Sequence, residues 1–160
     1  MVDIIIEKDE KILLIKRKKG PFKGMLALPG GHIRAGETVE KAAMREAKEE
    51  TSLHVKLLNI VGVYSNPKRD PRYPTISIAF IARVKKGKEK AGSDAKELLW
   101  MGLKEALKKK LAFDHKKILS DYAKIKNLSK NIFMLPSSSP VKDTTLSRLG
   151  RGFKSRWEHY

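Results

Sequence analysis

The chain has 160 residues, of which 41% are hydrophobic, enough for one domain with a real core. It contains no cysteine, which excludes disulfides, thiolate chemistry and cysteine-bound metal. No run of about 18 apolar residues occurs, so no membrane-spanning helix is predicted. The start, MVDIIIEKDEK, carries acids and lacks the features of a signal peptide. We therefore predict a cytoplasmic location.

The charge is strongly basic, with 35 Lys and Arg against 18 Asp and Glu and a formal net charge of +17. Such an excess attracts polyanions, and both nucleic acids and small diphosphates are candidates. The lysines are spread along the whole chain, and a lysine-rich surface of the kind reported for heat-adapted proteins explains the charge equally well. The charge alone does not identify a partner.

The first part of the chain predicts a hairpin, a loop and a helix. Two apolar runs around a polar turn predict a β-hairpin over 2–17. Gly and Pro indicate that residues 18–37 are mostly loop. Thr38 is a suitable N-cap for a helix that ends near Thr51.

The second part predicts strands and then helices. β-Branched and apolar residues predict strands over 54–64 and 75–84, separated by the loop SNPKRDPRYP. LLWM predicts a short strand over 98–101, and the segments 103–110 and 113–126 predict helices. These patterns stop after Leu128. The order predicts an α/β sandwich with a mixed sheet and flanking helices.

Three glutamates, Glu46, Glu49 and Glu50, lie within about one turn of the first predicted helix. Like charges at this spacing repel each other and destabilise the helix, so another interaction should offset the repulsion. We expect all three on the inward face, because they share it with apolar positions. The apolar residues of that face are Val39, Ala42, Ala43 and Leu53. The expected solvent face carries Glu40, Lys41, Met44, Lys48 and Thr51.

Inward carboxylates must be paired, hydrogen-bonded or coordinated. Carboxylate clusters suit hard divalent cations such as Mg²⁺ or Mn²⁺. Arg45 and several lysines offer the other explanation, pairing with the acids. A bound cation explains the convergence of three acids better than pairing does.

The spacing of this segment resembles the Nudix box. Gly31 is followed after five residues by Glu37, and after seven more by REAKEETSL, which begins at Arg45. Every acidic position of the box and its arginine are present. The pattern has Gly where this chain has Ser52, at a helix end that favours the left-handed conformation. We expect a modest loss of stability there and intact chemistry.

The resemblance implies a Nudix-type α/β/α sandwich that hydrolyses a nucleoside diphosphate linked to another group, with divalent cations neutralising the diphosphate. The implied metal ligands are Glu46, Glu49, Glu50 and the backbone carbonyl of Gly30. The implied catalytic set is Glu49, Glu50, Arg45 and Glu37, in which Glu37 and Arg45 orient the assembly. The general base stays open between a glutamate of the box and a later acid, Glu89, Asp94 or Glu97.

Segments outside the box resemble archaeal-type ADP-ribose pyrophosphatases. They are YSNPKRDPR, residues 64–72, and LAFDHKKILSDY, residues 111–122, and the whole resemblance spans about residues 2–126. It implies hydrolysis of ADP-ribose to AMP and ribose 5-phosphate. Lys68, Arg69 and Arg72 lie on the first segment and are candidates to bind phosphate. A well-braced turn with solvated charges is the alternative.

Other residues near the box are less informative. Tyr73 or Phe22 could stack on a base, although simple packing is the commoner role of an aromatic residue. His32 and Arg34 depart from the family pattern beside the expected site, where they could alter specificity. A lone histidine such as His115 is more often packed or solvated than bound to metal.

Two alternative functions stay open. One is a MutT-like hydrolase of oxidised nucleoside triphosphates. The other is a nucleic-acid-binding protein on a Nudix scaffold. The basic charge suggests this alternative, whereas the intact acidic residues of the box argue against it. The resemblance is also compatible with a homodimer.

We predict a domain over 1–128 and a dispensable, disordered basic tail over 129–160. The segment SSSP has the composition of a linker. With one choice of codons, GRGFKSRWE is encoded by a sequence containing GCGGG-TTCAAAT-CCCGC, a hairpin similar to a transfer-RNA T-arm. This motivates the hypothesis that the reading frame runs on into an adjacent transfer-RNA gene, which the gene sequence decides.

Overall fold

The computed structural model describes residues 1–92 and 95–133. Its strands are β1 (Val2–Lys8), β2 (Lys11–Arg17), β3 (Leu26–Ala27), β4 (Gly30–Gly31), β5 (His54–Tyr64), β6 (Ser77–Lys86) and β7 (Ala95–Gly102). Its helices are α1 (Val39–Thr51), α2 (Leu103–Lys108) and α3 (His115–Phe133). None of the helices in this described part is long and apolar enough to cross a membrane.

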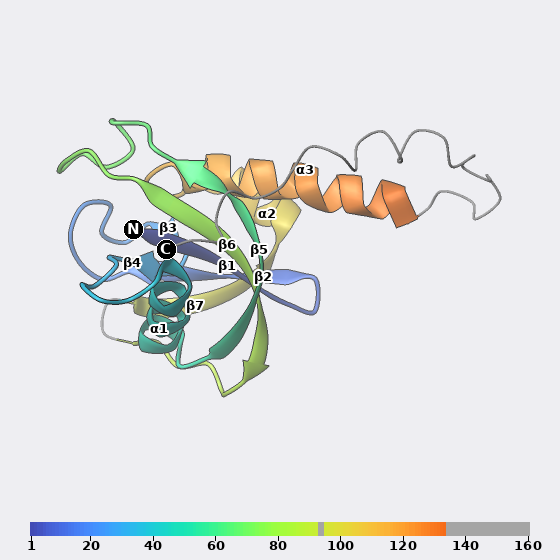
Figure 1. The fold of residues 1–160 in the computed structure, drawn as a ribbon, viewed down its shortest axis with the longest axis horizontal. Coiled ribbons are helices and arrows are strands. Elements are labelled where there is room, and N and C mark those ends of the chain that lie inside the picture. Colours follow the sequence, from blue (N-terminus) through green and yellow to red (C-terminus); the bar gives the residue numbers. More distant parts are fainter. Residues whose placement is uncertain (93–94, 134–160) are drawn as a thin grey trace, which may run out of the picture. The chain divides into compact units, whose positions relative to one another are not determined.

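The strands form one mixed sheet (Figure 1). The order is β3-β2-β1-β6-β5, with β4 also paired to β1 and β7 also paired to β2. β1 and β6 run parallel, whereas β1 pairs antiparallel with both β2 and β4. This arrangement confirms the predicted α/β class with a mixed sheet.

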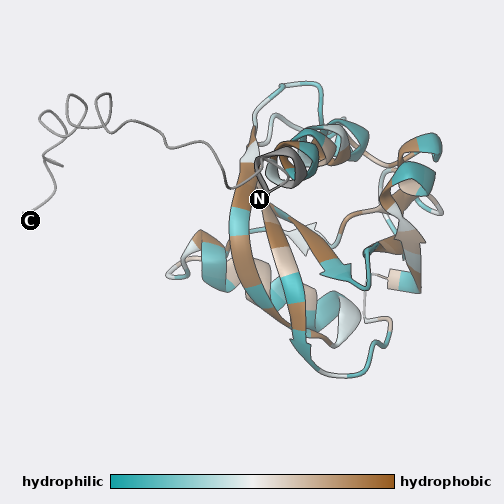
Figure 2. Cartoon of the chain, turned by 90° about the vertical axis from the view of Figure 1, so that its right-hand side faces the viewer, coloured by the Kyte–Doolittle hydropathy of each residue, from teal (hydrophilic) through white to brown (hydrophobic). Residues whose placement is uncertain are grey.

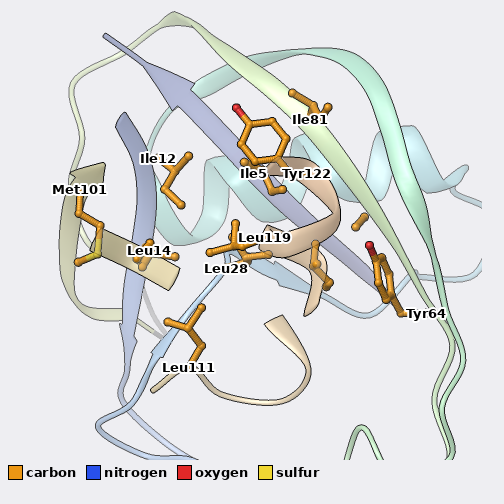
Figure 3. Packing of buried hydrophobic residues seen from close by; sticks show 13 residues of the cluster. Ile5, Ile12, Leu14, Leu28, Tyr64, Ile81, Met101, Leu111, Leu119 and Tyr122 are labelled. Carbon is orange, nitrogen blue, oxygen red and sulfur yellow. The ribbon is translucent and has the colours of Figure 1, made fainter. Parts of the chain in front are cut away.

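β1 is buried on both faces of the sheet over residues 2–6, four of which are apolar. Successive side chains of a strand point to opposite faces. Val2, Ile4 and Ile6 therefore pack in a cluster with Ala42, Ala43 and Ala47 of α1. Ile5, on the other face, packs in a cluster that includes Ile118, Leu119 and Tyr122 of α3 (Figure 3). Figure 2 shows brown, apolar segments along the strands.

The predicted hairpin, the first helix and the strand over 54–64 are confirmed. Several bounds differ. β6 spans Ser77–Lys86 rather than 75–84, and α2 ends at Lys108 rather than at residue 110. β7 begins at Ala95 rather than at residue 98, and α3 continues to Phe133, beyond the predicted end at residue 126. β3 and β4 were not predicted, because strands of two residues leave no period in the sequence. The part of the predicted tail over 134–160 lies outside the described residues.

Candidate active site

The site is built where residues 28–31, a turn that includes β4, approach α1. Gly30 and Gly31 pair with Asp3 and Val2 of β1. A side chain at either glycine would collide with its surroundings. A Cβ atom on Gly30 would lie 2.2 Å from the carbonyl oxygen of Val2, and one on Gly31 would lie 2.3 Å from Oε1 of Glu46. Glycine at position 30 therefore lets this segment lie against β1, and glycine at position 31 lets it lie against the side chain of Glu46 on α1.

Glu50 is attached to this turn. Its carboxylate oxygen Oε2 accepts a 2.9 Å hydrogen bond from the backbone N–H of Gly30. The residue is only 6% exposed. Glu46 lies one turn earlier on α1 and has a side chain that is 13% exposed. These two glutamates are thus the inward-facing acids of the box.

Arg45 joins four groups around the turn. It forms a bidentate pair with Glu37, with distances of 3.0 Å from Nε to Oε2 and 2.6 Å from Nη2 to Oε1. Its Nη1 donates to Glu46 at 2.7 Å and to Glu49 at 3.1 Å. Its Nη2 also donates to the backbone carbonyl of His32 at 2.9 Å. Arg45 therefore fixes Glu46 relative to the loop that precedes α1.

The charges of this cluster shift the pKa of two members. The hydrogen bonds from Arg45 and from the backbone N–H of Arg34 lower the pKa of Glu37 to about 2. The hydrogen bonds to Glu37 and Glu46 raise the pKa of Arg45, against the effect of its burial. Both groups are charged near neutral pH, so the ion pair of Glu37 and Arg45 persists there and acts as a clamp between the loop before α1 and the helix.

The predicted faces of α1 need two corrections. Glu49 was expected inward with Glu46 and Glu50, but its side chain is 40% exposed and pairs with Arg34 at 3.0 Å. Thr51 was expected to face solvent, but it is fully buried and its hydroxyl donates to the carbonyl of Ala47 at 2.5 Å. Both residues lie near the end of α1, where contacts with Arg34 and with the helix backbone override the simple helical period.

A cavity of about 440 Å³ opens beside the turn. Glu46, Glu50 and Asp3 supply its carboxylates. Its lining also includes basic side chains, namely Arg17, Lys19, Arg34, Arg69 and Arg72. Carboxylates beside cations suit a substrate whose negative charge is met partly by the protein and partly by a divalent cation. The donor set of Glu46, Glu50 and the Gly30 backbone fits an oxygen-preferring cation of this kind.

The predicted metal ligands are not all brought together. Within residues 1–92 and 95–129, no group of three or more His, Cys, Asp or Glu side chains is close enough to hold a metal ion. Glu46 and Glu50 line the cavity, whereas Glu49 is not among its lining residues. A cation at Glu46 and Glu50 would therefore take its remaining oxygen ligands from backbone, water or substrate.

The three predicted phosphate-binding residues have different surroundings. Arg72 lines the cavity with a partly exposed side chain and forms an ion pair with Asp70 at 2.7 Å. Arg69 also lines it, but its side chain is 2% exposed and paired with Asp3 at 2.9 Å and Asp114 at 2.8 Å. Lys68 is exposed and lines a neighbouring cavity of about 560 Å³ instead.

The two cavities share Arg69 and Phe113 in their linings. Phe113 lies against Phe22, with ring centroids 4.9 Å apart, and the guanidinium group of Arg17 lies 4.8 Å from the centroid of its ring. Tyr73 is half-exposed, and its hydroxyl lies 3.0 Å from Nε2 of His32. Phe22 therefore lines only the neighbouring cavity, where it packs on Phe113, the ring that both cavities share.

Two of the three later acids considered for the general base, Glu89 and Glu97, do not line the cavity that contains Glu46 and Glu50. Glu97 lies on β7 and pairs with Lys16 at 3.6 Å. Asp94 lies outside the described residues.

Sequence reasoning missed Asp3 and His115. Both are buried in the cavity wall, and Nε2 of His115 lies 3.2 Å from Oδ1 of Asp3. An acid inside the apolar run VDIII was the available signal, because a buried carboxylate needs a partner. The sequence offered no sign that this partner would come from residue 115.

The fold and this arrangement of the box define the class. The NUDIX domain family matches residues 1–122, and the chain belongs to that family. Its sequence is 59% identical over 126 residues to the ADP-ribose pyrophosphatase of Methanocaldococcus jannaschii, which covers 79% of this chain and 73% of the relative.

Solved structures show the same fold. The NUDIX domain of Shewanella oneidensis NrtR, complexed with ADP ribose, aligns with a TM-score of 0.67 and 24% identity, covering 78% of this chain and 86% of that one. A bifunctional NMN adenylyltransferase/ADP ribose pyrophosphatase from Francisella tularensis, complexed with AMP and a Mn ion, aligns with a TM-score of 0.65 and 28% identity. That alignment covers 81% of this chain and 40% of the other.

Proposed function

We propose that this Nudix protein hydrolyses ADP-ribose to AMP and ribose 5-phosphate. The observation that carries the substrate is the 59% identity to an ADP-ribose pyrophosphatase over most of both chains. The reaction class is supported by the cavity, in which Glu46 and Glu50 lie among several basic side chains. An anionic diphosphate matches that lining better than a neutral substrate would.

Nudix hydrolases generally use divalent metals, and we propose Mg²⁺ or Mn²⁺ for this chain. Glu46, Glu50 and the carbonyl of Gly30 would hold the cation. The bound cation would neutralise diphosphate charge and acidify the attacking water. The Gly30 N–H keeps the carboxylate of Glu50 in place, and Arg45 does the same for Glu46.

The remaining predicted residues receive different roles in this proposal. Glu37 orients Arg45 through two hydrogen bonds. The pairing of Glu49 with Arg34 and Arg45 favours a part in that clamp over a direct part in the reaction. Arg72 is the best-placed of the three loop cations to bind phosphate, because it is partly exposed and lines the cavity.

The proposal is tested with a panel of diphosphates in the presence of Mg²⁺, with products identified by chromatography. ADP-ribose should give the highest kcat/KM, and its products should be AMP and ribose 5-phosphate. More efficient turnover of 8-oxo-dGTP would assign the chain to the MutT-like alternative. Metal-independent, salt-dependent RNA binding without turnover of any diphosphate would favour the nucleic-acid-binding alternative. Homodimerisation and the cytoplasmic location stay predictions.

A further inference from the structure

The turn that contacts Glu50, residues 28–31, is itself held by hydrogen bonds to β1 and to the side chain of His115. The backbone carbonyl of Pro29 accepts a 2.8 Å hydrogen bond from the N–H of Ile4. The N–H of Leu28 donates to Nδ1 of His115 at 2.9 Å. Leu28 is two residues before Gly30, whose N–H contacts Glu50. The side chain of His115 is therefore linked to the carboxylate of Glu50 by two hydrogen bonds, one at Leu28 and one at Gly30, which lie two residues apart.

The partners of His115 define its tautomer. Because Nδ1 accepts from the N–H of Leu28, it cannot carry a proton of its own. The proton of the neutral ring then lies on Nε2, which donates to Oδ1 of Asp3 at 3.2 Å. Both ring nitrogens are thus used, and the ring is 3% exposed.

Asp3 is fixed in turn by groups from a third part of the chain. Its Oδ2 accepts from the hydroxyl of Ser77 at 2.6 Å and from Nη2 of Arg69 at 2.9 Å. Arg69 also pairs with Asp114, the residue before His115. Ser77 begins β6, and Arg69 lies on the loop before it. The histidine ring therefore has a rigid, charged anchor on one side and the turn on the other.

The segment around His115 has a further attachment to the same turn. The N–H of Ala112 donates to the carbonyl of Leu26 at 2.8 Å. Phe113, between the two contacts, has a φ of 52°, in the left-handed region that a bulky side chain disfavours. Unfavourable backbone conformations of this kind persist where the surrounding structure imposes them. Residues 112–115 are thus held against residues 26–28.

We propose that His115 is a positioning residue of the reaction, which holds the turn of Leu28–Gly31 against Glu50 through its neutral Nε2–H tautomer, with Asp3 and Arg69 as the anchor. The proposal rests on the proposed function, because it takes Glu50 as the centre of the site. It gives His115 no contact with the substrate. The residue acts through Leu28 and Gly30, and its loss should lower kcat more than it raises KM.

Two conservative variants of His115 each keep one of the two hydrogen bonds of the ring and remove the other. In His115→Asn the side-chain oxygen lies near the position of Nδ1 and can accept from Leu28, but the donor to Asp3 is lost. In His115→Gln the amide nitrogen lies near the position of Nε2 and can donate to Asp3, but the N–H of Leu28 loses its acceptor. The proposal predicts that kcat falls by about 10²-fold in His115→Gln, as for other small misplacements of a site. His115→Asn keeps the acceptor for Leu28 and loses only the bond to the anchor, so its kcat should fall clearly less than that of His115→Gln.

The melting temperatures of both variants are measured beside their kinetics. A merely structural role predicts that kcat follows the loss of stability in both variants alike, and that result would overturn the proposal. So would wild-type kcat in His115→Gln, or a larger loss in His115→Asn. If ADP-ribose is not the substrate, the comparison is made with whichever diphosphate the panel identifies, so the two proposals fail separately.

A spectroscopic measurement needs neither variant nor substrate. Long-range ¹⁵N–¹H correlation spectra of the full chain labelled at histidine distinguish the two neutral tautomers. The proposal predicts an unprotonated Nδ1 and a protonated Nε2 for His115, and slow hydrogen exchange of the Leu28 amide. A protonated Nδ1 at neutral pH would contradict it, because such a nitrogen cannot accept from Leu28.

Discussion

Arg69 lies on the loop whose sequence predicted phosphate binding, yet its guanidinium group is buried between two aspartates. Burial alone lowers the pKa of Arg69, but the hydrogen bonds and charges of Asp114 and Asp3 outweigh burial and raise it. Its Nε and Nη2 atoms donate to these carboxylates. Direct phosphate binding by Arg69 would require it to leave them, so the geometry favours a bracing role.

Replacing Arg69 by Ala should therefore affect stability first. The change leaves the buried Asp3 and the partly buried Asp114 without their cation, and breaking such a pair costs about 3–5 kcal/mol of unfolding free energy. Lys68→Ala is the control from the neighbouring position, where the side chain is exposed and a change within about 0.5 kcal/mol is expected. Urea unfolding measures both. Equal stabilities of the two variants would show that Arg69 does not brace the fold.

Among the elements, α1 was predicted most closely, because its signals are local. Thr38 is its N-cap and accepts from the N–H of Lys41, as the sequence indicated. The end of the helix is also as expected. Ser52 has a φ of 62° and its N–H donates to the carbonyl of Lys48. A left-handed residue at this point is the role that the family pattern gives to glycine.

Ser52→Gly should make the protein more stable. The left-handed conformation costs roughly 1 kcal/mol for a residue with a Cβ atom and little for glycine. Part of that gain is offset, because glycine has more freedom in the unfolded chain. We expect a small rise in melting temperature and unchanged kcat/KM. Ser52→Ala keeps the Cβ atom, so its melting temperature should not rise. If the melting temperature of Ser52→Ala rose as much as that of Ser52→Gly, the backbone explanation would be refuted.

At the scale of the whole molecule, the longer strands and the helices were predictable, but the buried cluster in the cavity wall was not. Hydrophobic runs and turn residues indicate strands and helices within short windows of sequence. In the cluster of Asp3, Arg69 and His115, Asp3 contacts two residues that lie at least 66 positions later in the chain. The parallel pairing of β1 with β6 and the start of α3 at His115 contribute to bringing them together. The inward acids of α1 were predictable from the box, but the exposure of Glu49 depends on Arg34 in the loop.

Acid should destabilise the whole fold through carboxylates held in ion pairs. The pKa values of Asp3 and Glu37 are each lowered to about 2, from 3.8 and 4.5 respectively. For Asp3, burial alone would raise the pKa, but interactions with His115, Ser77 and Arg69 outweigh it. Groups with lowered pKa values stabilise the fold above the unfolded-state values, and that contribution is lost as the pH falls through the folded-state ones.

The melting temperature should therefore fall steeply between about pH 4.5 and pH 2. Thermal unfolding followed by circular dichroism across this range measures the slope. Asp3→Asn removes one of the titrating groups and should give a shallower slope than the wild type, even though it is less stable at neutral pH. A variant slope as steep as that of the wild type would show that Asp3 does not contribute to the acid transition.

The central claim is that the cavity beside Glu46 and Glu50 is the centre of hydrolysis, and Glu50→Gln tests it most directly. The amide oxygen can still accept from the N–H of Gly30, but the charge that would hold a cation is gone. Glu40→Gln makes the same chemical change at an exposed position of α1. With Mg²⁺ and ADP-ribose, we predict that Glu50→Gln lowers kcat by about 10²-fold or more. The melting temperature of Glu50→Gln should stay near that of the wild type. The kinetics of Glu40→Gln should be unchanged. Near-normal turnover by folded Glu50→Gln protein would contradict the assignment of the site.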